Sequence, residues 1–416
     1  MWGMIFARQG KPFTFSIWFT VCLGVLCAGY FPAVAATTAA TATSGSALVV
    51  QYDNTARQIG ISIVSTSPAI ARLMQTAFSI HGAFNTSVPA SSVEYVLRFT
   101  EAGPGRVDVS VESKTSGGSS FQAEGVGKDS TEAAYSAGDA VVEKLTQRPG
   151  FFAGKLAFIS KRTKYAEIWV SDLLGQAPLQ ITTDRSTSAN PRWSPDGTKL
   201  LYYGYYASGF PDIILVNFAS GKRSTFAAYE GTNMGGVFSP DGKSVAMILS
   251  SKEGGTELYV SDATGKNVHR LTHSVSSKSS PTWSPDGKQI ILTCDPRGSP
   301  LLYKIAATGG SLDLVKDNSY AYSAEPAWNP RDSDVIAFMQ QMSNGTEQVL
   351  TYNFKTGKID TLADGYEPCW TNDGRHIIYT NRVKGQEQLY IVDSITKKMS
   401  SLTTKGASDP AFVYAK

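Results

Sequence analysis

The side chains that most often do chemistry in proteins are few in this sequence. Only four histidines occur, at His81, His269, His273 and His376, and no Gly-x-Ser-x-Gly motif marks a serine nucleophile. His269 and His273 stand four residues apart but flank the short strand-like segment Arg270–Thr272, so they are not the one-face pair of a zinc helix. We therefore predict surface histidines, no catalytic residue, no metal site and no cofactor.

Acidic residues recur at one kind of position. Asp196, Asp241 and Asp286 each stand in the sequence Ser-Pro-Asp-Gly. The proline fixes one backbone angle and the glycine accepts a positive φ, which is the chemistry of a hairpin turn. We therefore interpret these carboxylates as turn formers and not as general acids or bases.

These turns belong to an internal repeat that runs through the C-terminal part of the chain. Each copy places an aromatic residue just before the turn, and successive aromatic residues are 45, 45, 45, 42 and 42 residues apart. A period of this length, with β-forming residues between the copies, is typical of β-propeller blades. The aromatic positions are Trp193, Phe238, Trp283, Trp328, Trp370 and Phe412.

Six repeats predict six blades of four strands in a ring closed by the end of the chain. Residues 155–189 contain three strand-like segments without a preceding motif, whereas Asp409–Ala415 has a motif and no strands after it. The last segment therefore supplies the missing inner strand of the first blade, which leaves no open edge. Cys294 and Cys369 fall in different repeat units, so we predict two buried thiols and not a disulfide.

We assign the propeller to residues 151–416 and a separate α/β domain to residues 48–150, which makes the whole protein mainly β. Ser67-Pro68 offers an N-cap and a first-turn proline for a helix that ends at Gly82, and Ser130 opens a second helix. The linker between the domains is short, which indicates that they pack against each other. Strands are predicted at residues 48–52, 59–64, 93–100, 106–113 and 121–126.

Composition and charge exclude two broad classes of protein. With 42% hydrophobic and 18% charged residues the chain is not predominantly disordered, and 38 basic against 35 acidic residues, without a basic stripe, predicts no nucleic-acid partner.

Residues 1–35 combine basic residues, an apolar run and a final Ala-Val-Ala, the order of a secretory signal cleaved after Ala35. A retained membrane anchor is the alternative. Residues 36–47 are predicted to be a flexible tail.

A secretory signal, a small α/β domain and a six-bladed propeller closed by its last strand together resemble the TolB family of periplasmic translocation proteins. The resemblance extends over essentially the whole chain after residue 35. Its most specific part is the domain junction, where Ala140–Thr146 is similar to the family's interdomain segment ending in Glu-Lys-Leu-Thr. Arg57–Gly60 resembles the family's Arg-Pro-Ile-Gly with Gln58 in place of proline, and the rest of the α/β domain departs considerably from the family.

The resemblance implies a non-enzymatic, monomeric scaffold of the Tol–Pal envelope system in the periplasm, with roles in protein transport, outer-membrane integrity and cell division. It implies two partners, a Pal-like peptidoglycan-associated lipoprotein at the propeller and a TolA-like inner-membrane protein at the mature N-terminus. No small-molecule substrate is expected. Two alternatives stay open: a carbohydrate-active propeller enzyme resembling oligogalacturonide lyases, and a surface binding protein unrelated to Tol.

Two segments are candidate partner sites. In five of the six repeats a proline stands two residues before the aromatic residue, and Gly236 takes its place in the other repeat. The residue before this position lies on one rim of the channel. It is neutral on three consecutive blades and acidic on the next three. We expect the neutral half to admit a partner closely and the acidic half to attract basic side chains or a cation. The rim set, which includes neighbouring residues, is Asn190, Thr232, Asn233, Gly235, Ser279, Ser280, Glu325, Glu367 and Asp409. The N-terminal set, which could extend a sheet by β-augmentation, is Leu48, Val49, Val50, Gln51 and Tyr52.

Overall fold

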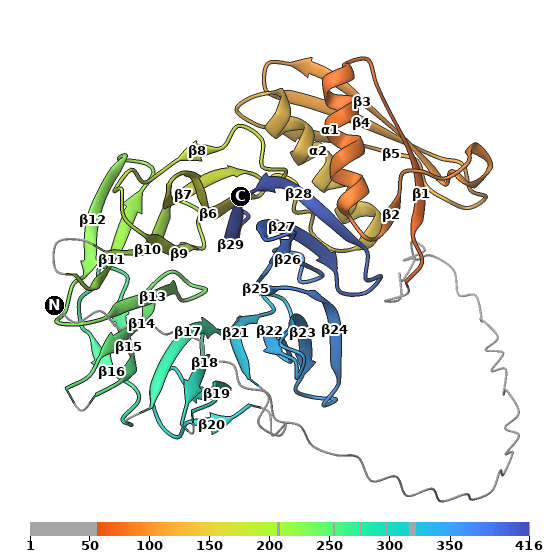
Figure 1. Ribbon diagram of the computed structural model, residues 1–416. Helices are drawn as coiled ribbons and strands as arrows, with labels where there is room; N and C mark the ends of the chain where they lie inside the picture. The colour runs from red at the N-terminus through yellow and green to blue at the C-terminus, as the bar shows by residue number, and fades with distance from the viewer. Residues whose placement is uncertain are drawn as a thin grey trace, which may run out of the picture. The chain divides into compact units, whose positions relative to one another are not determined.

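The computed structural model describes residues 56–205, 209–252, 254–274, 276–296, 298–315 and 322–415, without the side chains of residues 403–405 (Figure 1). The predicted signal, tail and strand at residues 48–52 lie outside these residues. The described chain contains a small mixed α/β sheet domain followed by a six-bladed β-propeller, which confirms the predicted fold class.

The α/β domain is a five-stranded sheet with the order β2-β1-β3-β4-β5. Neighbours β2, β1 and β3 are parallel, and β3, β4 and β5 are antiparallel. Helices α1 and α2 pack against each other and against this sheet (Figure 1). No helix among the described residues has the length and apolar character needed to cross a membrane. The elements are β1 (Ile59–Ser65), α1 (Pro68–Ile80), β2 (Phe84–Asn85), a single 3₁₀ turn (Ala90–Ser92), β3 (Tyr95–Gly103), β4 (Arg106–Ser113), β5 (Phe121–Val126) and α2 (Ser130–Thr146).

The residue pattern explains these elements. Alternate residues of β4, including Val107 and Val109, are buried, as a sheet with one covered face requires. Helix α1 begins at Pro68 as predicted, but the side chain of Ser67 makes no capping hydrogen bond, so the proline alone sets this end. Helix α2 is capped by Asp129, whose carboxylate accepts from the backbone N–H of Glu132 at 2.9 Å.

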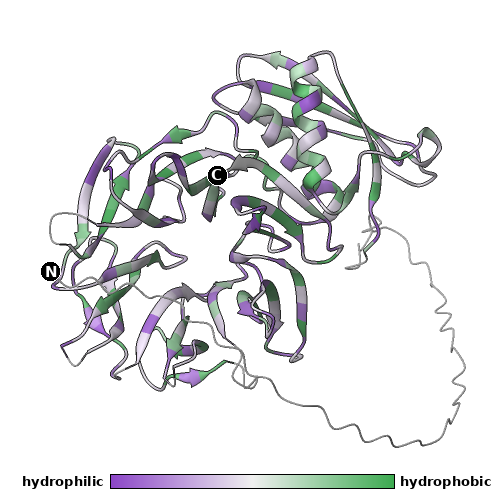
Figure 2. Cartoon of the chain, viewed as in Figure 1, coloured by the Kyte–Doolittle hydropathy of each residue, from purple (hydrophilic) through white to green (hydrophobic). Residues whose placement is uncertain are grey.

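The propeller consists of six four-stranded antiparallel blades, numbered I to VI here, and apolar residues recur along the strands of every blade (Figure 2). From the channel outward, blade I is β29 (Ala407–Val413), β6 (Lys155–Thr163), β7 (Tyr165–Asp172) and β8 (Leu179–Gln180), and blade II is β9 (Ser188–Trp193), β10 (Lys199–Tyr205), β11 (Pro211–Asn217) and β12 (Lys222–Ala227). Blade III is β13 (Asn233–Phe238), β14 (Ser244–Ser250), β15 (Thr256–Asp262) and β16 (His269–Arg270), and blade IV is β17 (Ser277–Trp283), β18 (Gln289–Asp295), β19 (Leu301–Ala306) and β20 (Asp313–Leu314). Blade V is β21 (Ser323–Trp328), β22 (Val335–Gln341), β23 (Glu347–Asn353) and β24 (Ile359–Asp364), and blade VI is β25 (Tyr366–Trp370), β26 (His376–Val383), β27 (Gln386–Asp393) and β28 (Met399–Lys405).

Blade I joins the two ends of the propeller. Strand β29 pairs antiparallel with β6, and the register places Phe412 opposite Leu156 and Ala411 opposite Ala157. The innermost strand of this blade is therefore the last strand of the chain. The ring closes without a free inner edge, as the repeat predicts.

The repeated motif performs two structural tasks. In the turns, Asp241 accepts from the hydroxyl of Ser239 at 2.6 Å and from the backbone N–H of Lys243 at 3.1 Å, and these bonds lower the pKa of its carboxyl. The prediction that the acids at Asp196, Asp241 and Asp286 form turns is confirmed, because all three make the same pair of bonds.

The tryptophans of the motif connect blades in pairs. The indole N–H of Trp193 donates to Ala411 in blade I at 3.1 Å, that of Trp283 to Val237 in blade III at 3.0 Å, and that of Trp370 to Ala327 in blade V at 3.0 Å. The indole of Trp328 bonds within its own blade instead, to Ser333 at 2.9 Å. Phenylalanine occupies the two remaining positions and has no N–H to donate. Indole bonds therefore join blades I with II, III with IV, and V with VI.

The two domains share one hydrophobic core. Phe151 and Phe152 are fully buried in the linker, between helix α1 residues such as Phe78 and blade I residues such as Leu156. The carboxylate of Asp139 on helix α2 accepts from the backbone N–H of Phe152 at 2.7 Å and of Ala153 at 3.0 Å. The α/β domain is therefore packed onto the propeller, as the short linker predicts.

Removal of residues 409–416 should open the ring. The truncation deletes most of β29 and takes Phe412 and Val413 out of the core, and each large apolar side chain lost costs about 1.5 to 3 kcal/mol. We expect the melting temperature, followed by circular dichroism, to fall by about 10 °C or more. A control truncation of residues 415–416 should melt like the full chain. Equal melting temperatures for the two truncations would contradict this closure.

Candidate docking site at the channel mouth

The six predicted rim positions share one unusual backbone conformation. Asn190, Gly235, Ser280, Glu325, Glu367 and Asp409 all have a positive φ, of 56°, 68°, 50°, 55°, 55° and 51° in that order. Each lies where the pairing of an inner strand with its neighbour shifts register, which marks a β-bulge. Since this region disfavours L residues other than glycine, five of the six blades hold a strained residue here.

Bonds between blades compensate part of this strain. The backbone N–H of Glu367 donates to the carboxylate of Glu325 at 2.7 Å, that of Asp409 donates to Glu367 at 2.6 Å, and that of Asn190 donates to Asp409 at 2.7 Å. Each acid thus binds the bulged amide of the next blade. We name Glu325, Glu367 and Asp409 the carboxylate ladder. Charge-assisted bonds of this kind are stronger than neutral ones.

The ladder overturns the expected anionic half of the rim. Burial raises the pKa of Glu325 to about 7, and burial together with the charges of Asp409 and Glu325 raises that of Glu367 to about 8. Asp409 is buried and forms an ion pair with Arg192 at 3.1 Å. All three carboxyl groups are engaged with neighbouring blades, and the raised pKa values of Glu325 and Glu367 leave these two partly protonated near neutral pH. The acidic half therefore does not present three free negative charges to a partner.

The neutral rim residues differ in how far they are accessible. Asn233 is fully buried, and its side chain bonds the backbone of Tyr229 and Gly231 at distances of 2.7 to 3.0 Å. This side chain is used to fold its own loop, and its predicted contact with a partner stays a prediction. Thr232, Ser279 and Ser280 are half-buried, and a role for them in binding stays a prediction.

The rim encloses a cavity of about 430 Å³. Five of the six bulged residues line it, and in four blades the proline that follows the bulge lines it too. In all six blades the residue two positions after the bulged residue also lines the cavity. This last set, which sequence reasoning missed, contains one charged member, Arg192, and could have been found by advancing the repeat alignment by two residues. Its members are Arg192, Val237, Thr282, Ala327, Cys369 and Ala411. Both cysteines of the described chain are free thiols, with Cys294 buried and Cys369 half-buried.

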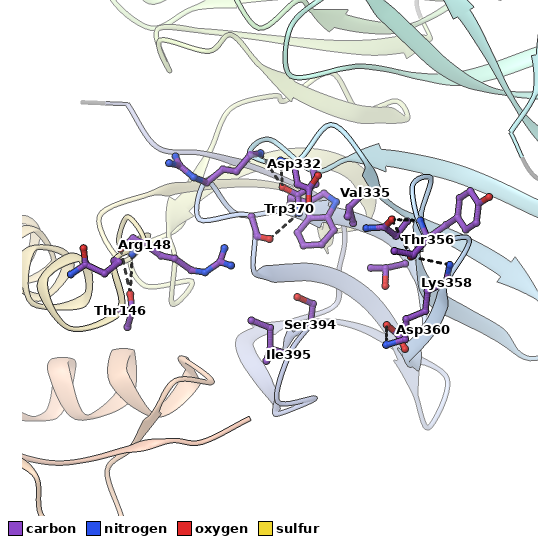
Figure 3. Close-up of a pocket in the computed structure, with 17 residues that line it drawn as sticks. Thr146, Arg148, Asp332, Val335, Thr356, Lys358, Asp360, Trp370, Ser394 and Ile395 are labelled. Carbon is purple, nitrogen blue, oxygen red and sulfur yellow. Dashed lines mark hydrogen bonds and ion pairs between the residues drawn. The ribbon is translucent and has the colours of Figure 1, made fainter. Parts of the chain in front are cut away.

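A second hollow lies where helix α2 meets blades V and VI (Figure 3). Its volume is about 730 Å³, and Thr146 and Arg148 stand at one side with Lys358 and Asp360 at the other (Figure 3). Basic and acidic side chains are mixed along this hollow, and the guanidinium of Arg148 donates to the backbone oxygen of Asp373 at 3.3 Å. The arrangement has no nucleophile and base in contact, and it is a polar groove at the domain junction.

Two histidines depart from the surface position predicted for all four. His269 and His273 are exposed, but His81 and His376 are almost fully buried at the domain junction. His376 accepts from the backbone N–H of Gly82 at 3.0 Å through Nε2, and its Nδ1 lies 2.6 Å from Asp373. The α/β domain covers this turn of blade VI, and that contact is the reason for the burial.

The same residues are the one described group that could hold a metal ion. Ligand atoms of His81, Asp373 and His376 lie within 4.8 Å of one another. However, Nδ1 of His81 accepts from Ala83 at 3.2 Å, and Nε2 of His376 accepts from Gly82, so two lone pairs are already in use. Burial lowers the pKa of His81. At His376 burial acts in the same direction, but the charges and hydrogen bonds of Asp373 and Asp393 together outweigh it and raise the pKa. The arrangement favours a polar clasp between domains over a metal centre.

The fold and this site define a class of protein, a closed six-bladed propeller with a docking cavity and an attached α/β domain. Residues 142–414 match the family model described as the TolB beta propeller domain, and the chain belongs to this family.

Individual relatives are more distant. The Tol-Pal system protein TolB of Bordetella pertussis and that of Bordetella parapertussis are each 30% identical over 194 residues, which cover 45% of this chain and 44% of theirs. The chain thus spans less than half the length of these curated relatives. The crystal structure of TolB from Acinetobacter baumannii has a TM-score of 0.76 at 22% identity, covering 86% of this chain and 97% of that one, which shows a common fold.

Replacing Glu325 and Glu367 together by Gln should flatten the pH dependence of stability. Their folded pKa values of about 7 and 8 exceed the ordinary 4.5, so folding binds protons and the wild type loses stability as pH rises from about 4.5 to 8. Glutamine keeps an acceptor for the bulged amides and removes the charge. By urea unfolding at pH 5 and pH 8, we expect the double variant to lose several kcal/mol less than the wild type over this window, since each pKa unit corresponds to about 1.4 kcal/mol.

A matched control for this measurement is Asp286→Asn. Asp286 is an exposed turn residue whose pKa is lowered by the hydroxyl of Ser284, so it stays ionised throughout the same window. It should reproduce the wild-type pH dependence. Parallel profiles for the wild type and the double Glu variant would mean that the ladder does not titrate as described.

Proposed function

We propose that this protein is an exported, non-enzymatic scaffold of the Tol–Pal system, and that a Pal-like lipoprotein docks at the channel mouth. The observation that carries the proposal is the cavity of about 430 Å³ inside the ring of bulged residues. Its wall is made of prolines and of small, aromatic and charged side chains carried by the paired inner strands. Such a wall accepts a protruding loop of a partner without rearrangement.

The chemistry of the cavity supports binding over catalysis. Its described lining contains one arginine, three acids and one thiol, but no histidine, and the acids are engaged in holding blades together. The alternative of a carbohydrate-active enzyme needs clustered histidine, arginine or glutamine in the channel. Measurable eliminative cleavage of acidic oligosaccharides by the purified protein would overturn the scaffold proposal in favour of that alternative.

The proposal includes a second partner and a cellular role. A TolA-like inner-membrane protein binds the mature N-terminal segment, including residues 48–52, and the protein acts as a monomer in the periplasm in support of outer-membrane integrity and cell division. Membership of the TolB propeller family and the names of the Bordetella relatives support this assignment.

Docking at the mouth should be blocked by a bulky residue at Ser280. This serine already holds a Cβ at a φ of 50°, so Ser280→Tyr adds volume at the cavity without demanding a new backbone conformation. By titration calorimetry with the soluble domain of a Pal-like lipoprotein, we expect at least about tenfold weaker binding, equal to about 1.4 kcal/mol. Lys288→Tyr, in an exposed turn at the opposite end of the blade, is the control and should bind normally. Normal binding by a folded Ser280→Tyr variant would place the docking site elsewhere.

The N-terminal segment can be tested separately. Deleting residues 36–52 from the mature protein should abolish capture of the periplasmic domain of a TolA-like protein, because a segment that orders on its partner contributes its contacts only when present. Capture of the lipoprotein domain by the same deletion variant is the internal control and should persist. Undiminished TolA-like capture would make the segment a spacer.

A further inference from the structure

The chain topology determines which loops surround the channel mouth. Inner strands begin at the mouth and second strands return to it, so the turn after each second strand and the connection into the next blade lie on this face. The α/β domain contacts the opposite face, where Asn372 bonds the backbone of Gly150 at 3.0 Å in the turn between β25 and β26. Among the described residues, the mouth face is therefore not covered by the α/β domain.

Exposed cations gather on two adjacent blades of this face. We name as the basic arc six exposed residues at the end of β6 and the turn after it, in the connection into β9, and at the end of β26 and the turn after it. They are Lys161, Arg162, Lys164, Arg185, Arg382 and Lys384. The two turns are neighbours across the seam between blades I and VI, because the charge of Lys161 acts on Glu387. Glu387 pairs with Arg382 at 3.1 Å, and among the described residues this is the one ion pair that a member of the arc makes.

Aromatic rings support the cations of the basic arc. The guanidinium of Arg162 lies 5.6 Å from the centre of the Trp169 ring, and the ammonium of Lys164 lies 5.5 Å from that of Tyr165. Such contacts hold cationic side chains near one orientation at modest energetic gain. The positive charges of Arg162 and Lys164 are therefore held beside the rings of Trp169 and Tyr165.

Other blades carry an apolar surface on the same face. Phe210 is 52% exposed in the β10–β11 turn, Tyr229 is 49% exposed in the connection into β13, and Met342 is 38% exposed in the β22–β23 turn. Tyr205 is exposed at the end of β10, and Tyr322 is exposed just before β21. Aromatic residues, methionine and arginine are the residue types enriched in protein interfaces.

We propose that the mouth face binds a folded protein with an acidic surface, oriented with its acidic edge over blades I and VI and its apolar edge over blades II, III and V. The proposal rests on the proposed function and specifies its partner. A folded protein suits the face better than a membrane, since a concave cavity between the two regions accepts a protruding loop and a flat bilayer cannot fill it. Opposite charges steer association and suppress wrong orientations.

The test compares two triple variants of the full mature chain. Lys161→Gln, Lys164→Gln and Lys384→Gln remove half of the basic arc, whereas Lys243→Gln, Lys266→Gln and Lys288→Gln remove three exposed lysines from turns on the opposite face. Stopped-flow association rates are measured with the soluble domain of a Pal-like lipoprotein between 20 and 300 mM NaCl. We expect the basic-arc variant to associate about tenfold more slowly at low salt with a flattened salt dependence, and the control to match the wild type.

The outcomes separate the proposal from the function on which it rests. If the wild type binds the lipoprotein domain and the two triple variants associate alike, the acidic-partner proposal is wrong and the docking function stands. If the wild type does not bind the domain at all, both are wrong.

Co-sedimentation with phosphatidylglycerol vesicles provides the last comparison. Vesicle binding that disappears in the basic-arc variant, with unchanged lipoprotein association, would assign the arc to a membrane and overturn the proposal.

Discussion

Six inner strands must converge on one axis, and the bulge in each of them is the constraint on which the rest of the propeller depends. A bulge with a positive φ bends the strand and turns its amide toward the neighbouring blade. In blades VI, I and II that amide meets a carboxylate of the blade before it, and in blade V the amide of Glu325 meets the hydroxyl of Thr293 in blade IV at 3.2 Å. Each ladder acid therefore has a structural role, because its carboxylate accepts the hydrogen bond of the bulged amide in the following blade.

The shared core sets a second constraint, on how the α/β domain can move. Asp139 on helix α2 binds the end of the linker, and burial raises the pKa of its carboxyl to about 7 despite the two bonds from backbone N–H groups. Burying this carboxyl group costs free energy, and the hydrogen bonds from Phe152 and Ala153 offset that cost. Together with the contact of Gly82 with His376, they hold the domain against blades I and VI at separate points. Displacement of the domain as a unit would break polar contacts at both ends.

The blade count, the closing strand and most helix and strand positions were predictable, because aromatic spacing and Asp-Gly turns depend on local chemistry that every repeat shares. The bulge was not predictable, since Asn190, Ser280 and Glu367 have no residue type in common and the positive φ arises from convergence at the channel. His376 shows a related limit. It occupies the place held by Ser244 and Gln289 in other blades, which are half-buried, and only the covering domain makes it buried. A repeat alignment places a residue within its blade but cannot tell what lies on that blade.

The alternation of indole bonds around the ring has a consequence for how the blades are joined. Trp193, Trp283 and Trp370 join the blades into three pairs, and no described indole donates across the seams between the pairs. By its indole bonds alone the sixfold ring is thus a threefold set of two-blade units, and bonds of other kinds cross the seams between the pairs. Two of those seams, between blades II and III and between blades IV and V, also lie outside the carboxylate ladder. Neutral hydrogen bonds join the blades there, from Asn233 to Pro211 at 3.2 Å and from Glu325 to Thr293 at 3.2 Å.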